Sequence, residues 1–168
     1  ATTRPETMLG DTAVAVNPND KRYKKLVGKM VRLPLVGKEI PIIADKAVEK
    51  EFGTGAVKVT PAHDQTDWEM GERHGLERIQ VIGTDGKMTT EAGEWKGLKV
   101  EQAREAIMEQ LDQQGFLVKT EVHKHSVGIC YRCSRVIEPL SLAQFFIKVK
   151  PLAEKALVAL DKKETVIL

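Results

Sequence analysis

The sequence predicts an α+β fold in which a small closed or strongly bent β-sheet, barrel-like in form, is flanked by a few helices. Apolar and β-branched runs are short and closely spaced, and proline and glycine separate most of them. Only a few segments carry the periodicity of a helix. The sequence contains no internal repeat or low-complexity tract that would favour another architecture.

The first predicted strand is DTAVAV, at 11–16, and the NPND that follows it is typical of a turn or a helix start. Residues 30–48, MVRLPLVGKEIPIIADKAV, contain short extended runs that proline and glycine interrupt. We therefore expect hairpin-like pieces in this part of the chain.

A strand, a turn and a helix start follow one another in GTGAVKVTPAHDQTDWEMGERHG, at 53–75. Two valines alternate with Lys58 and Thr60 at the period of a strand with one buried face, so these two polar side chains share the other face. Pro61 has no amide hydrogen and biases Thr60 away from helical angles, so the strand should end near it.

The predicted helix begins just beyond this strand. Asp64 is a suitable N-cap, Asp67 lies in the first turn, where the helix dipole favours anions, and Gly75 supplies a C-terminal stop. Polar side chains from both elements therefore meet at one strand-to-helix junction: Lys58, Thr60, His63, Asp64 and Asp67.

Two interpretations of this junction stay open. An Asp N-cap followed by a first-turn Asp is common at helix starts, and His63 could be a loop histidine bonded to backbone. The polar strand face that ends at the helix start favours a functional role. Backbone amides at a helix N-terminus attract anions, whereas two carboxylates attract an ammonium group, so a zwitterionic or ester ligand would suit the site.

In the second half of the chain, residues 77–89 repeat the hairpin pattern around the turn signal Asp85-Gly86. Residues 99–115 form a clear amphipathic helix that ends at Gly115. Strands are expected over 116–130 and 141–149, and a terminal helix is expected to start at Pro151. The apolar face of the amphipathic helix comprises Ala103, Ala106, Ile107 and Leu111.

Composition excludes several classes of protein. The 26 basic residues against 24 acidic ones give a net charge of +2, too small to indicate nucleic-acid binding unless a basic patch is local. No apolar run is long enough to span a bilayer and no secretory signal is present, so we expect a cytoplasmic protein without a membrane partner. Because the chain opens on ATTRPETMLG without methionine and stops at ETVIL, we expect it to be a fragment of a longer polypeptide.

The two cysteines, Cys130 and Cys133, form a single CYRC pair, which is half of a tetrahedral zinc site or a redox dithiol. His123 and His125 precede them and could complete four ligands, although a His-x-His alternation also suits a strand. Three interpretations stay open: an internal zinc site, a half-site completed by partners outside this chain, and a metal-free turn. A thioredoxin-like motif is disfavoured because no βαβ pattern surrounds the pair.

Three long motifs resemble the editing domain inserted into valyl-tRNA synthetases, class I aminoacyl-tRNA synthetases whose editing domain shares its fold with the isoleucyl and leucyl ones. They are ATTRPETMLGDTAVAV at 1–16, FGTGAVKVTPAHDQTDWEMGERHG at 52–75, and the return segment GICYRCSRVIEPLSLAQFFIKVKPLAEKA at 128–156. The isoleucyl pattern has Thr-Thr-Thr-Pro-Trp and Gly-His-Gly in place of two of these stretches. Leucyl domains carry a similar start but usually lack Lys-Val-Thr, so the leucyl family is the second choice.

The resemblance implies an editing domain over 1–150 and a helical segment over 151–168 that returns to the synthetase core. It implies hydrolysis of mischarged Thr-tRNA(Val), with tRNA(Val) and the rest of a monomeric synthetase as partners. ATP would be used only by the synthetic core, and editing itself would need no cofactor. Valyl-tRNA synthetases are the established case in which a hydrophobic pocket rejects threonine by only about 100-fold, so a second site must recognise the hydroxyl.

Site residues follow from the same resemblance, position by position. Asp67 matches the aspartate that binds the substrate α-ammonium, and Lys58 and Thr60 resemble the contacts to the threonyl side chain and ester. Asp64 and His63 are expected to take part in catalysis without settled roles: Asp64 could cap the helix, hold His63, contact the hydroxyl or orient water. The expected substrate-binding residues are Thr2, Thr3, Arg4, Phe52, Lys58 and Thr60; Thr3 is a candidate near the terminal adenosine, and Phe52 could equally be a core residue.

Ester hydrolysis by a positioned water needs neither a metal nor a covalent nucleophile, so no catalytic metal is expected. Two rival classes remain: a non-catalytic module that positions the tRNA end, and a metallohydrolase that uses His63, Asp64 and Asp67. The second lacks a clear further group of ligands in the sequence.

Overall fold

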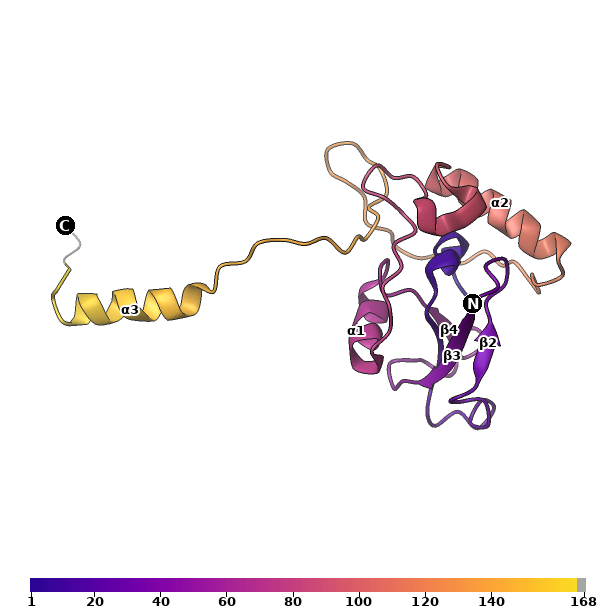
Figure 1. The fold of residues 1–168 in the computed structure, drawn as a ribbon, viewed down its shortest axis with the longest axis horizontal. Coiled ribbons are helices and arrows are strands. Elements are labelled where there is room, and N and C mark those ends of the chain that lie inside the picture. Colours follow the sequence, from indigo (N-terminus) through magenta and orange to yellow (C-terminus); the bar gives the residue numbers. More distant parts are fainter. Residues whose placement is uncertain (166–168) are drawn as a thin grey trace.

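The computed structural model describes residues 1–165, in which short strands and helices alternate in an α+β arrangement (Figure 1). The α+β class predicted from the sequence is confirmed. The elements are the 3-10 helix η1 (Pro5–Gly10), strands β1 (Ala13–Val16), β2 (Met30–Arg32), β3 (Glu39–Ala44) and β4 (Ala56–Val59), helix α1 (Gln65–His74), the 3-10 helix η2 (Thr90–Trp95), and helices α2 (Val100–Gln113) and α3 (Val149–Asp161).

The four strands form one sheet in the order β2-β3-β1-β4. Strand β1 is parallel to β3 and antiparallel to β4, with Ala13 opposite Val59 and Val14 opposite Lys58. Strand β2 pairs antiparallel with β3. Within the described residues β2 and β4 are therefore the edges of the sheet, and no ladder between them closes it.

Alternation along β4 places its two sets of side chains as predicted. Val59 is fully buried beside Ala13 and Ala15 of β1, and Met70 of α1 packs onto the same cluster. Lys58 and Thr60 consequently point to the other face of the strand, as the period of two requires.

Helix α1 begins and ends at the residues that the sequence predicts. The Asp64 side chain accepts a hydrogen bond from the Asp67 amide at 3.0 Å, and Gly75 closes the helix in the left-handed region, with φ of 64°. A Cβ at Gly71 would lie 3.0 Å from Pro61, so glycine there lets the helix approach the end of β4 closely.

Helix α2 packs against η1 and η2 through the apolar face that the sequence predicts. Ala103, Ile107 and Leu111 are buried, and Ala106 is partly buried beside them. Val81 and Ile82 complete this second core cluster. This cluster includes Leu9 and so packs η1, the segment that follows Arg4, against α2.

The strands expected over 116–130 and 141–149 are wrong, because neither segment contains a strand in the structure. Only single bridges form nearby, between Ile129 and Val136 and, in the predicted hairpin over 77–89, between Ile82 and Met88. Val118 and Phe145 are almost fully exposed. Strand propensity reflects packing on a pleated surface, and these segments meet no such surface here.

Helix α3 begins at Val149, two residues before the expected start, with Pro151 still in the first turn, where its missing amide removes no helical bond. None of its residues is buried, and it lies apart from the sheet at the end of an extended stretch (Figure 1). The division expected between 1–150 and 151–168 stays a prediction, and residues 166–168 lie outside the described part.

Among residues 1–165, no helix combines the length and the apolar character that crossing a membrane would require.

Candidate functional site

The face of β4 opposite the core carries a polar cluster, which we define as half-buried Lys58 with the buried residues Thr7, Asp11, Thr60 and Asp67. Lys58 Nζ donates to Thr7 Oγ1 at 2.8 Å and to Thr60 Oγ1 at 2.6 Å, and it lies 3.4 Å from Asp11 Oδ1. The Thr60 hydroxyl in turn donates to Asp11 Oδ1. One ammonium group therefore orders two hydroxyls and a carboxylate on the strand face that the sequence predicts.

Asp67 joins this cluster from the first turn of α1. Its Oδ2 accepts the backbone amide of Thr60 at 2.8 Å, whereas its Oδ1 receives no hydrogen bond from any residue in 1–165. Burial, followed by the nearby charge of Asp64, raises the pKa of Asp67 to about 6, against the opposing effects of the Thr60 amide and Lys58. The carboxylate is thus desolvated with one acceptor free.

Sequence patterns alone do not single out Asp11. It is fully buried just before β1, and burial raises its pKa to about 6 although Lys58 and the Thr60 hydroxyl act in the opposite direction. The antiparallel pairing of β1 with β4 is what brings Asp11 to the end of β4, next to Thr60. The local sequence does not reveal this pairing. The only local signal is an aspartate directly before a buried strand.

His63 is buried, and its ring contacts backbone. The amides of Val81 and Ile82 donate to its Nε2 at 2.9 and 3.3 Å, which places the ring proton on Nδ1. Nδ1 is buried without a partner in hydrogen-bonding geometry among the described residues. Burial, opposed by the backbone of Pro139, lowers the pKa of His63 to about 4. The Nε2 lone pair is therefore engaged, and a catalytic role for His63 stays a prediction.

Asp64 is exposed and caps α1 through its bond to the Asp67 amide. This contact fixes the first turn and with it the Asp67 carboxylate. Of the roles left open for Asp64, the structure contains the helix cap.

The N-terminal segment joins the junction through Arg4, whose Nη1 donates to the carbonyl of His63 at 2.9 Å. The Arg4 guanidinium also pairs with Glu138 and lies 3.5 Å from Glu6, which is buried. Thr2 accepts the Arg4 amide at 3.0 Å, and Thr3 is exposed. The segment therefore lies beside the end of β4 and the start of α1.

Phe52 lies outside the polar cluster, in the turn before β4. Its side chain is 52% exposed, which argues against the core alternative. Its ring meets the ring of His123 edge to face at 5.8 Å, and His123 stacks on His125 at 5.5 Å. The aromatic side chain is thus accessible at the surface, apart from the hydrogen-bonded groups.

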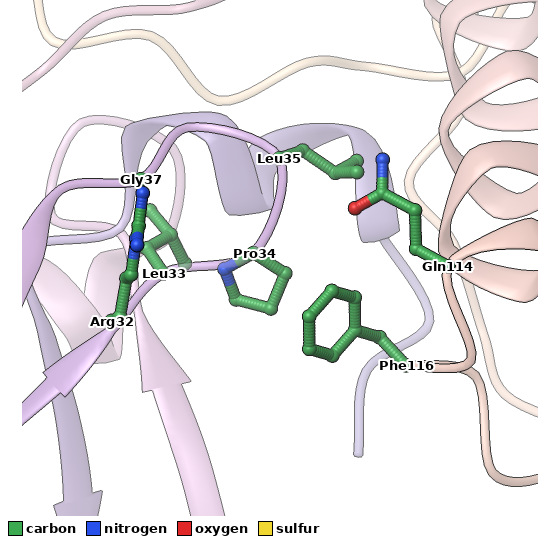
Figure 2. Close-up of a pocket in the computed structure, with 7 residues that line it drawn as sticks. All are labelled: Arg32, Leu33, Pro34, Leu35, Gly37, Gln114 and Phe116. Carbon is green, nitrogen blue, oxygen red and sulfur yellow. The ribbon is translucent and has the colours of Figure 1, made fainter.

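Two surface hollows differ in their relation to this chemistry. One hollow, lined by the residues in Figure 2, lies between the 32–37 turn and the end of α2, and its volume is about 410 Å³. Its lining is mostly apolar and shares no residue with the polar cluster. Another, of about 460 Å³, lies beside α1 and includes Asp64, Trp68 and Arg78. We assign the candidate site to the polar cluster, because the charged and perturbed groups gather there.

The CYRC pair lies at the tip of a tight hairpin. Cys130 donates its amide to Arg135 O and accepts the amide of Ser134 at its carbonyl, both at 2.8 Å. Backbone amides of Cys133 and Arg132 lower the pKa of the Cys130 thiol, which favours the thiolate that a metal binds. The described residues do not gather His123 and His125 with the cysteines, and no group of three potential metal ligands occurs among them.

Comparison with known proteins identifies a family. The family model for the leucyl-tRNA synthetase editing domain matches residues 25–112. A solved structure titled "The crystal structure of GlLeuRS-CP1" superposes with a TM-score of 0.57, covering 73% of this chain and 83% of that one at 17% identity, which supports the fold alone.

Similar sequences carry the name valine–tRNA ligase. The relative in Symbiobacterium thermophilum is 59% identical over 96% of this chain, and that in Thermotoga maritima is 56% identical over 98%. The chain spans only 18% and 19% of these relatives, about a fifth of their length. The resemblance noted in the sequence is thereby confirmed.

Proposed function

Because the chain belongs to the family of leucyl-tRNA synthetase editing domains, we propose that it hydrolyses the ester of a wrongly charged tRNA. The names of its relatives favour a valyl enzyme over a leucyl one, so we assign Thr-tRNA(Val) as the substrate. The reaction breaks the bond between the threonyl carbonyl carbon and the ribose oxygen, with water as the nucleophile. The products are threonine and tRNA with a free 3′ end.

The observation that carries the proposal is the buried Asp67 carboxylate, which accepts the Thr60 amide at Oδ2 and has Oδ1 free of hydrogen bonds from the described residues. A carboxylate that burial has destabilised binds an ammonium group strongly, because the pair restores its ionisation. The α-ammonium of an aminoacyl ester is such a group. Asp67 would thus anchor the ester at the end of β4.

Selection of threonine is assigned to Lys58 and Thr60, supported by Asp11. Their side chains offer donors and acceptors to a substrate hydroxyl, and valine would leave the same groups without a partner, which costs free energy. Lys58 also supplies positive charge next to the carbonyl, where an oxyanion develops. Arg4, Thr2 and Thr3 border the same junction, and Phe52 offers an aromatic surface for the terminal adenosine.

Catalysis by a positioned water without a metal fits the donor set. The Nε2 lone pair of His63 already accepts two amides, so the histidine of the possible metal-binding trio offers no free ligand nitrogen. We assign His63 a positioning role, in which it fixes the turn between β4 and α1.

Features beyond the site complete the proposal. Cys130 and Cys133 suit half of a zinc site whose remaining ligands lie elsewhere in the synthetase, where zinc would hold the hairpin. ATP-dependent aminoacylation would belong to the rest of that enzyme. We infer a monomeric, cytoplasmic protein that acts on tRNA(Val).

Deacylation of Thr-tRNA(Val) by this chain, with and without EDTA, tests the function. We expect hydrolysis that EDTA leaves unchanged and that spares Val-tRNA(Val). Absence of hydrolysis would contradict the proposal and favour a module that only positions the tRNA end, whereas EDTA-sensitive hydrolysis would favour a metallohydrolase.

A further inference from the structure

The loop between β1 and β2, with β2 itself, concentrates positive charge. Six of the thirteen residues in 20–32 are basic and one, Asp20, is acidic, in a chain whose net charge is only +2. We call this segment the basic loop. Its cationic residues are Lys21, Arg22, Lys24, Lys25, Lys29 and Arg32.

Most of this charge is uncompensated. Asp20 is engaged by Arg22 at 2.6 Å, and none of the other five cations forms an ion pair with an acidic residue in 1–165. All five are exposed. Such a surface attracts a polyanion, although a charged run on a protein is often only solvated.

The second observation is that the basic loop is held against the segment that leads to the candidate site. Arg22 Nη2 donates to Lys50 O at 2.8 Å, and Tyr23 Oη donates to Thr54 O at 2.6 Å. These bonds attach the basic loop to the turn that carries Phe52 and continues into β4.

Gly55 shows that this attachment is built into the backbone. A Cβ at Gly55 would clash with Arg22 Nη2 and lie 2.8 Å from Lys50 O, and the residue adopts a φ of +75°. Only glycine combines this conformation with space for the guanidinium. The backbone around Arg22 and Tyr23 is therefore held beside the turn that precedes β4, and Lys21, Lys24 and Lys25 flank this attachment in the sequence.

We propose that the basic loop contacts the phosphates of the tRNA next to its 3′ end. The proposal rests on the proposed function, which makes a tRNA the partner. From Ala56, where the attached turn ends, to Thr60 is about 13 Å along the strand. A 3′ end that reaches Thr60 would pass the exposed Phe52 and bring its preceding phosphates to the basic loop.

Binding of uncharged tRNA(Val) to this chain tests the proposal without requiring hydrolysis. The variant is Lys21→Ala/Lys24→Ala/Lys25→Ala, and the matched control is Lys87→Ala/Lys96→Ala/Lys155→Ala, which removes three exposed lysines elsewhere. Anisotropy of labelled tRNA is measured from about 50 to 200 mM salt. We expect the basic-loop variant to bind tRNA about 10-fold more weakly than the parent at 0.1 M salt. The slope of the logarithm of the binding constant against the logarithm of the salt concentration should become shallower by about 2. The control variant should bind within about twofold of the parent.

The proposal would be overturned if both variants lost the same affinity for tRNA, if neither lost any, or if the parent showed no measurable binding. Vesicles containing phosphatidylserine distinguish an anionic membrane: if the basic-loop variant loses vesicle binding but keeps its affinity for tRNA, the surface serves lipid.

In deacylation, we expect this variant to show a raised KM with kcat within about twofold. A parent that binds tRNA through the basic loop but hydrolyses no Thr-tRNA(Val) would refute the proposed function and leave this inference standing.

Discussion

At the C-terminal end of α1, Asp45 accepts hydrogen bonds from Arg73 at 3.1 Å and from the Ala47 amide at 2.9 Å, and it contacts His74 at 3.0 Å. At the N-terminal end, Asp67 accepts only the Thr60 amide from the described residues. Both residues have small exposed fractions, 6% and 7%, although protein surrounds the Asp67 carboxylate more deeply. Burial alone would raise both pKa values, but the Ala47 amide and Arg73 hold the pKa of Asp45 below its usual value, whereas that of Asp67 rises to about 6.

The difference separates an aspartate that stabilises the fold from one suited to a ligand. A buried carboxylate with a fixed cation gains from ionisation, and one without such a partner costs free energy until a cation arrives. Asp11 is an intermediate case, because Lys58 lies 3.4 Å from it but burial still raises its pKa to about 6. Unfavourable local electrostatics of this kind are typical of functional sites.

The largest expected effect is on hydrolysis by Asp67→Asn. Without the carboxylate the substrate ammonium has no charged partner, so kcat/KM for Thr-tRNA(Val) should fall about 30- to 1000-fold. A steady-state deacylation assay measures this fall. Activity within twofold of the parent would rule out Asp67 as the ammonium site.

The same variant should not lose stability. The ionised Asp67 destabilises the fold above about pH 6, so Asp67→Asn should raise the free energy of unfolding by about 1 to 3 kcal/mol at pH 7.5. This gain should shrink as the pH falls from about 6 to about 4, because the parent carboxyl then becomes protonated in the folded state. Urea unfolding at several pH values measures it, and a lower stability at pH 7.5 would show that Asp67 is a structural residue like Asp45.

A smaller loss of activity is expected for Lys58→Met, which keeps much of the stem but removes the ammonium. Thr7, Thr60 and Asp11 lose their shared donor, and kcat/KM should fall about 10- to 100-fold. Lys46→Met, at an exposed position outside the cluster, is the control. Equal activities of the two variants would remove Lys58 from the site.

The smallest effect on hydrolysis is expected at the other end of α1. Asp45→Asn should keep kcat/KM within about twofold while lowering the free energy of unfolding by about 1 to 2 kcal/mol, because it weakens the bonds to Arg73 and Ala47. Since the pKa of Asp45 is lowered from 3.8, this contribution is present above that pH and is lost as the pH falls further. A large loss of activity with unchanged stability would contradict a purely structural role for Asp45.

Local rules predict much of this region from sequence. Alternation locates the faces of β4, and the cap residues locate both ends of α1, so local sequence suffices to bring Lys58, Thr60 and Asp67 together. Asp11 does not follow in the same way, since its place depends on antiparallel pairing across residues far apart in the chain. Thr7, whose hydroxyl accepts a hydrogen bond from Lys58, is brought there by the packing of η1 against α2.

The failures have a related cause. Residues 116–130 and 141–149 have the composition of strands but find no sheet edge to pair with in the structure. A strand, unlike a helix with its own hydrogen bonds, requires a partner that local sequence does not name. The basic loop can be read from the sequence, but its place beside the turn that leads into β4 cannot, because that place depends on the bonds of Arg22 and Tyr23 to Lys50 and Thr54.

Titration of the Asp67 carboxyl by NMR, with the signal assigned through Asp67→Asn, tests the central contrast most directly. It is done on the free chain and with a non-hydrolysable threonyl-amide analogue of the terminal adenosine. We predict an apparent pKa near 6 in the free chain, and a clear downward shift when the analogue supplies its ammonium. An ordinary pKa near 3.8 that the analogue leaves unchanged would contradict the account.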